Sequence, residues 1–232
     1  MRKFLIVAAG IGLMNAAAVS AAAPPPQSVE AKLAALKTSM AKNQAALRHY
    51  SWVETTTVSY KGEVKSTRQA TASFLPDGTV QKVPIGAPPQ QQTESGLRGR
   101  IKANKVEEMT DYMKSAVALV KTYVPPQPTK LQAVKTADKV SLTMAPAGAA
   151  TLNFAGYEKP GDNLAITIEP AASRITGINV ASYLDDPSQP VTLVVAMASL
   201  PDGTSHVGTT TLNAPAKSLS VSIANSNYKK IN

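Results

Sequence analysis

Alternation of apolar and polar residues with a period of two constrains this chain most, because it recurs in ten short segments. Three of them lie between residues 52 and 83 and seven lie after residue 139. Turn sequences such as Lys61-Gly62-Glu63, Pro76-Asp77-Gly78 and Pro201-Asp202-Gly203 separate the segments. Short strands joined by tight turns pair antiparallel, and a period of two puts the apolar side chains on one face. The pattern therefore predicts one antiparallel sheet of about ten strands with a single apolar face.

Three other segments have the apolar spacing of three and four residues that is typical of amphipathic helices. They are residues 28–49, 106–124 and 129–138, and these helices must cover the apolar face because nothing else in the chain can do so. We expect an α+β fold in which a strongly curved sheet forms a half-open barrel, with the helices in its mouth and a cavity between the layers. Residues 84–104 follow neither period, which predicts a long mobile loop.

The amino terminus is typical of a cleavable signal peptide. Arg2 and Lys3 precede an apolar stretch that ends at Val19, and small residues up to Ala23 come before three prolines. The stretch is shorter than the roughly 20 residues of a membrane span, although a retained anchor helix is the alternative. The chain has no cysteine, which excludes lipid attachment at this site and disulfides. We expect residues 1–23 to be removed by cleavage near Ala23. The remaining residues 24–232 should form a single soluble β domain with a helical insertion near 105–138. This domain should be located in the periplasm or outside the cell.

Charge argues against a nucleic-acid partner. The formal net charge is +9, but the basic residues are spread out, and only those from Arg98 to Lys105 lie close together. Nucleic-acid-binding surfaces usually cluster basic residues and interleave them with aromatic ones. The basic cluster in residues 96–105 is either a solvated loop or a point of transient contact with an anionic membrane surface.

Residues that carry catalytic chemistry are scarce. There is no cysteine nucleophile and no Gly-x-Ser-x-Gly elbow. His49 and His206 have no second ligand at metal-site spacing, and we interpret both as ordinary surface histidines. Asp185, Asp186 and Asp202 would bind calcium only if two turns met in space, and otherwise they belong to ordinary turns. We predict a protein that is not an enzyme and that has no metal or cofactor.

Two resemblances follow from these features. The segments Tyr50-Ser51-Trp52-Val53-Glu54, Tyr183-Leu184-Asp185-Asp186-Pro187 and Asn225-Ser226-Asn227-Tyr228 resemble a family of uncharacterised secreted bacterial proteins, to which no activity is attached. The order of signal peptide, amphipathic helix, meander, helical insertion and further strands is similar to the periplasmic lipoprotein carrier and receptor superfamily (LolA/LolB-like). The second resemblance implies a concave hydrophobic surface that shields acyl chains, but it has no motif that transfers a binding residue.

The expected cavity defines the candidate ligand-binding residues. On the predicted strands, Glu54 and Arg68 share the parity of apolar neighbours, so they form either an inward ion pair or two surface groups. The methionines of the second helix either adapt to apolar ligands or simply pack in the core. The candidate residues are Trp52, Glu54, Val58, Tyr60, Arg68, Met109, Met113 and Val117. We expect a non-enzymatic periplasmic binding or carrier protein for a hydrophobic or lipid-linked ligand; the alternative is a ligand-free envelope scaffold or protein-interaction module.

Overall fold

A computed structural model describes residues 29–86, 97–145, 148–169 and 174–231, with only the backbone described for residues 97–106 and for part of the first helix. The helices are α1 (Val29–Leu47), α2 (Leu97–Tyr123) and α3 (Pro128–Thr136), with a short 3-10 helix η1 (Pro215–Lys217). The strands are β1 (Tyr50–Tyr60), β2 (Glu63–Phe74), β3 (Val80–Ile85), β4 (Val140–Met144), β5 (Ala150–Ala155), β6 (Asn163–Glu169), β7 (Arg174–Tyr183), β8 (Pro190–Ser199), β9 (Ser205–Ala214) and β10 (Leu219–Lys230).

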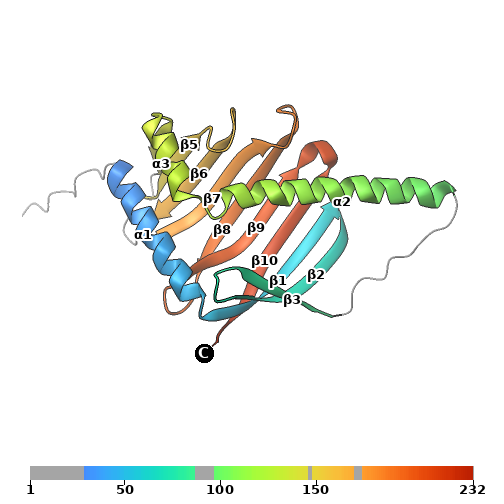
Figure 1. Cartoon of the computed structure of the whole chain (residues 1–232), viewed down its shortest axis with the longest axis horizontal. Coiled ribbons are helices and arrows are strands. Elements are labelled where there is room, and N and C mark those ends of the chain that lie inside the picture. The colour runs from blue at the N-terminus through green and yellow to red at the C-terminus, as the bar shows by residue number, and fades with distance from the viewer. Residues whose placement is uncertain (1–28, 87–96, 146–147, 170–173, 232) are drawn as a thin grey trace, which may run out of the picture.

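The ten strands form one antiparallel sheet in the order β3-β2-β1-β10-β9-β8-β7-β6-β5-β4. Its edges β3 and β4 do not meet, so the sheet is open, and the predicted α+β fold is confirmed. Since β3 and β4 follow each other in sequence but lie at opposite edges, the segment between them has to cross the whole sheet. Figure 1 shows α2 making that crossing. A 27-residue helix is about 40 Å long, close to the width of ten strands spaced about 4.8 Å apart.

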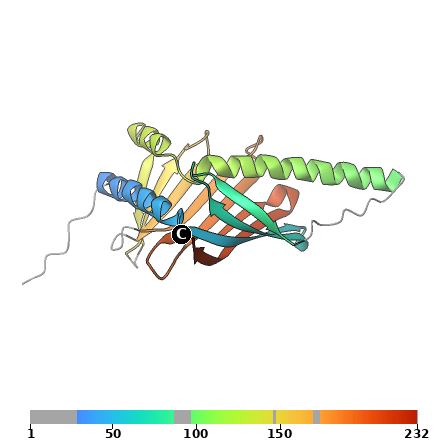
Figure 2. The ribbon, with the colours of Figure 1, turned by 60° about the horizontal axis from the view of Figure 1, so that its bottom comes forward.

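All three helices lie on the same face of the sheet (Figures 1 and 2). Cross-strand pairing places the buried apolar residues on that face: Leu193 lies opposite Leu212, Ile166 opposite Ile178, and Leu152 opposite Ile166. Leu131 and Val134 of α3 and Tyr123 of α2 complete the core. The alternation that is visible in the sequence therefore corresponds to an apolar face that the helices cover and a polar face that no described helix covers.

Local turn chemistry follows the sequence closely. Lys61 (φ 53°) and Gly62 (φ 78°) form the two-residue connection between β1 and β2, where positive φ at both positions favours glycine and matches the twist of a hairpin. The pairing of β6 with β7 shifts register next to Gly177, as expected for a β-bulge.

The predicted loop over residues 84–104 is partly wrong. Strand β3 continues to Ile85, and α2 begins at Leu97, nine residues earlier than the predicted start at Val106. Gly99 interrupts the helical spacing of apolar residues in this part of the sequence. One glycine nevertheless costs a helix only about 1 kcal/mol and does not end it. Residues 87–96 and the side chains of the basic cluster lie outside the described part of the structure, so the expected membrane contact stays a prediction.

The signal peptide predicted for residues 1–23 also lies outside the described residues. Among the helices that the structure describes, none combines the length and the hydropathy needed to cross a membrane.

Candidate functional site: a cavity beneath helix α2

A cavity of about 710 Å³ lies between the middle of α2 and the strands β2, β1 and β10. Pockets that hold one small ligand usually have volumes of about 300–1,000 Å³, so this space is large enough for a ligand. Its lining residues are Thr56, Val58, Tyr60, Lys65, Ser66, Arg68, Met109, Thr110, Met113 and Leu219.

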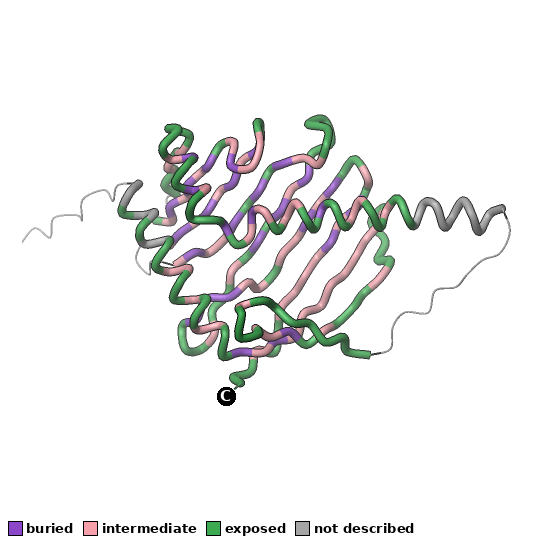
Figure 3. Tube along the Cα trace, in the orientation of Figure 1, coloured by how far each residue is buried: buried purple, intermediate pink, exposed green. Residues whose placement is uncertain are grey.

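The cavity exists because the core ends before the sheet does. Figure 3 shows the buried positions concentrated on the strands from β5 to β9, whereas β1 and β2 are mostly half-buried or exposed. Helices α1 and α3 lie toward the other end of the sheet, where α1 contacts β7 and β9 and α3 contacts β5. Of the three described helices, only α2 lies over β1 and β2, and a single helix leaves space beside it.

The inner walls of the cavity are apolar. Val58 and Leu219 line it from the sheet, and Met109 and Met113 line it from α2. All but Leu219 are half-buried, whereas Leu219 is only 3% exposed. Methionine side chains are unbranched and adjust to irregular apolar shapes, which suits a flexible hydrocarbon ligand.

Polar groups enter the cavity from β2. Between Val58 and Ser59 the pairing of β1 with β2 shifts by one residue, which makes Lys65 the extra residue of a β-bulge. The bulge explains why consecutive residues, Lys65 and Ser66, both line the cavity. Lys65 forms an ion pair with Glu63, while Arg68 has no ion pair or hydrogen bond with any residue in the described ranges.

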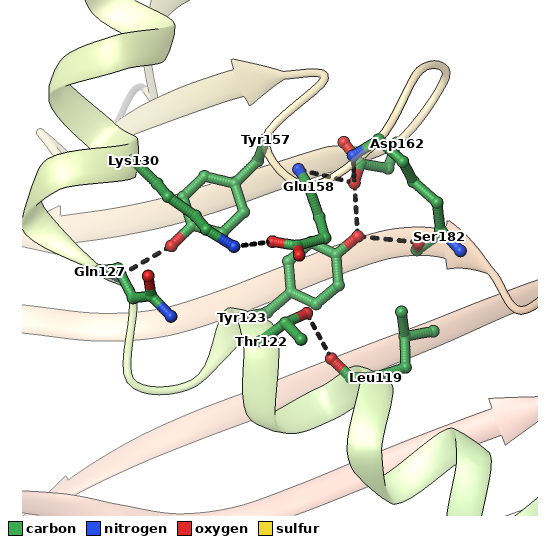
Figure 4. A network of polar contacts seen from close by, with 10 residues as sticks. Leu119, Thr122, Tyr123, Gln127, Lys130, Tyr157, Glu158, Asp162 and Ser182 are labelled. Carbon is green, nitrogen blue, oxygen red and sulfur yellow. Dashed lines mark hydrogen bonds and ion pairs between the residues drawn. The ribbon is translucent and has the colours of Figure 1, made fainter.

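Helix α2 is tied to the sheet at its carboxyl end by a buried polar network (Figure 4). The Tyr123 hydroxyl donates a hydrogen bond to Asp162 Oδ2 and lies 2.8 Å from Ser182 Oγ. The same Asp162 oxygen accepts the backbone N–H groups of Glu158 (3.0 Å) and Lys159 (2.9 Å). Burial first, and then the hydrogen bond to Asp162, raise the pKa of Tyr123, so this hydroxyl stays protonated and remains a donor.

A second tie holds the middle of α2 beside the cavity. Lys217 of η1 forms an ion pair with Glu108 at 3.1 Å, and its ammonium group lies 5.7 Å from the centre of the Tyr112 ring. The helix is therefore held on the side of β10 and at its end, while the stretch that faces β1 and β2 borders the cavity.

Five of the eight predicted site residues line this cavity: Val58, Tyr60, Arg68, Met109 and Met113. The other three do not. Val117 is 43% exposed on α2. Trp52 lies at the opposite end of β1, buried between Phe74 and Tyr228 with ring centres 5.5 and 5.6 Å away.

The inward ion pair predicted between Glu54 and Arg68 is wrong. Glu54 instead pairs with Lys82 of β3, at 2.6 Å. Glu54 and Arg68 do lie on the same face of the sheet. Arg68 pairs directly with Thr56, which is two residues from Glu54 on β1. The register, however, offsets them by two residues, and Lys82 reaches Glu54 across the sheet from the edge strand.

The surface interpretation holds for His49, which is exposed, and is wrong for His206. His206 is only 6% exposed and its ring packs on Tyr228, with the ring centres 4.0 Å apart. Within the described ranges, no three acidic or histidine side chains come close enough to hold a metal ion. The calcium alternative for Asp185, Asp186 and Asp202 is therefore not supported.

Asp202 serves the fold by accepting two hydrogen bonds. The Tyr50 hydroxyl donates to its carboxylate at 2.5 Å, and the Thr204 backbone N–H donates at 3.0 Å. The hydrogen bond from Tyr50, followed by that from Thr204, lowers the pKa of Asp202 to about 2.

A stability change in acid follows from this lowered pKa. The carboxylate of Asp202 binds a proton less readily in the folded state than in the unfolded chain. Its contribution to the stability of the fold is therefore complete above pH ~4 and is lost as the pH falls through about 2. We expect the urea midpoint to fall between pH 4 and pH 2 less steeply in Tyr50→Phe than in the original chain. Tyr228→Phe should keep the original slope, since that hydroxyl donates to the Val207 carbonyl. Equal slopes in all three proteins would contradict the assignment.

Sequence reasoning missed half of the cavity lining. Thr56 and Ser66 have the same parity as Val58 and could have been included on that ground. Leu219 could not, because it reaches the site only through the pairing of β10 with β1, more than 150 residues away in sequence. Lys65 depends on a bulge that has no clear sequence signal.

Comparison with known proteins adds little. No protein-family model matches the chain, and no curated protein matches it. Among solved structures, a DUF1329 family protein from Desulfovibrio piger is similar, with a TM-score of 0.43 and 10% sequence identity over 87% of this chain and 92% of that chain.

Proposed function

We propose that this protein is a non-enzymatic binding or carrier protein of the cell envelope, which holds a hydrophobic or lipid-linked ligand between α2 and the sheet. The observation that carries the proposal is the cavity of about 710 Å³ whose inner walls are Val58, Leu219, Met109 and Met113. A space of this size with apolar walls is costly to leave in water and favourable to fill with hydrocarbon. The sequence pattern at residues 1–23 supports a location in the periplasm or outside the cell.

The proposal is tested by native mass spectrometry of the purified chain and by titration with a fluorescent fatty acid. We expect Met113→Asp to weaken fatty-acid binding at least tenfold, because a carboxylate in the apolar wall has to be desolvated when the acyl chain enters the cavity. Ser115→Asp is the matched control: it adds the same charge to an exposed position of the same helix and should leave binding unchanged. Binding that is equal in both variants, or absent from the original chain, would contradict the proposal.

The uncovered face of the sheet favours a second candidate, a scaffold or protein-interaction module. In the described strands, three adjacent cross-strand rows run over β1, β10, β9, β8, β7, β6 and β5 without any charged side chain. The middle row continues to β4 and consists of Thr57, Ser222, Thr211, Val194, Asn179, Ala165, Asn153 and Ser141. The cores of protein–protein interfaces are depleted in charged residues, so an uncharged face of this width would suit contact with another protein. A native mass spectrum that contains only the mass of the protein without a bound lipid would favour this candidate.

A further inference from the structure

The rim of the cavity on β2 has an uncompensated positive charge. Three carboxylates next to lining residues each have their own lysine: Glu63 pairs with Lys65, Glu54 with Lys82 at 2.6 Å, and Glu108 with Lys217 at 3.1 Å. Arg68 lines the cavity and has no such partner among the residues that the structure describes. The described lining residues include no acidic side chain, so this part of the site favours a ligand with negative charge.

Hydrogen-bonding groups lie beside this arginine. Ser66 is two residues away on the same strand and therefore on the same face, and its hydroxyl makes no described hydrogen bond. Thr56 lies directly opposite Arg68 on β1, but its hydroxyl already donates to Glu54 at 3.5 Å. Arg68 and Ser66 thus remain as donors for an outside acceptor.

The cationic residues and the large apolar residues occupy different sides of the cavity, since Lys65 and Arg68 both come from β2. Arg68 and Ser66 come from β2, while Leu219 comes from β10, two strands or about 10 Å farther toward the core. Met109 and Met113 cover the space from α2. A bound molecule would therefore meet the cation on the β2 side and mainly apolar side chains on the side of β10 and α2.

From this polarity we propose that the cavity binds a single-chain amphiphile with an oxyanion head group, either a carboxylate or a phosphate. The head is held by the Arg68 guanidinium and the Ser66 hydroxyl, and the chain lies between Val58, Met109 and Met113. The guanidinium fork matches the geometry of both oxyanions. A volume of about 710 Å³ suits one chain better than two. This inference depends on the proposed function and specifies its ligand class.

The test measures the affinity of the full chain for four probes: oleate, oleoyl lysophosphatidate, oleyl alcohol and inorganic phosphate. We expect Arg68→Gln to weaken the binding of both anionic lipids about tenfold, which corresponds to about 1.4 kcal/mol. The affinity for oleyl alcohol should change by less than about twofold. Arg68 is exposed, so its replacement should not unfold the protein. Lys42→Gln is the matched control, because it removes one positive charge from an exposed position on α1, away from the cavity, and it should leave all affinities unchanged.

The outcomes separate this inference from the function on which it depends. If none of the three lipids binds, the proposed function itself fails. If oleate and oleyl alcohol bind equally well and Arg68→Gln affects neither, the cavity is an apolar site without head-group recognition and only the present inference is overturned. If inorganic phosphate displaces the lipids at comparable concentration, the head alone is the ligand, which also overturns the inference.

Discussion

Replacing Phe154 by alanine is expected to lower the free energy of unfolding by about 3–5 kcal/mol. Phe154 is fully buried on β5, where it pairs with Val140 on one side and Leu164 on the other. Removing its ring takes away apolar burial and leaves a cavity inside the core cluster, which relaxes only partially to fill it. The measurement is urea unfolding followed by circular dichroism.

The control for this substitution is the neighbouring residue. Asn153 lies on the same strand but points to the uncovered face, where it pairs with Ser141 and Ala165. Asn153→Ala should change the free energy of unfolding by no more than about 0.5 kcal/mol. Similar losses for both substitutions would contradict a sheet with one covered face and one uncovered face.

A loss of about 3 kcal/mol is expected for Asp162→Ala. Asp162 is only 3% exposed, and its carboxylate accepts hydrogen bonds from the Tyr123 hydroxyl and from two backbone N–H groups. Without it, the N–H groups of the half-buried Glu158 and Lys159 lose their acceptor, and a donor left without an acceptor costs about 1–3 kcal/mol when it is buried. The Tyr123 hydroxyl keeps Ser182 as its other partner, which limits the total.

The same substitution bears on the cavity, because this network fixes the carboxyl end of α2. We expect Asp162→Ala to weaken fatty-acid binding as well, by loosening the helix that carries Met109 and Met113. Asp185→Ala is the matched control, since this aspartate is exposed and makes no described hydrogen bond. If both variants unfold at the same urea concentration, the network does not anchor α2.

Parts of the candidate site followed from local patterns. Val58 and Tyr60 share a strand face by parity, and Met109 and Met113 share a helix face by their spacing of four, so each pair is visible without a structure. That the two pairs meet is a consequence of the predicted covering of the sheet by its helices. The partner of Glu54 was not accessible in this way, because choosing between Arg68 and Lys82 requires the register of three strands.

The sequence of neighbouring residues by itself determined which segments form helices, strands and turns, and which side of each helix or strand is apolar. The period of two, the helical stripes and turns such as Lys61-Gly62 depend on residues within a few positions of one another, where backbone geometry leaves few choices. The tertiary structure alone decided that β10 pairs with β1, that Asp162 receives the hydroxyl of Tyr123, and that the core ends at Leu219 with space beyond it. These contacts join distant segments, and their positions depend on how every strand and helix packs together, which no local pattern records.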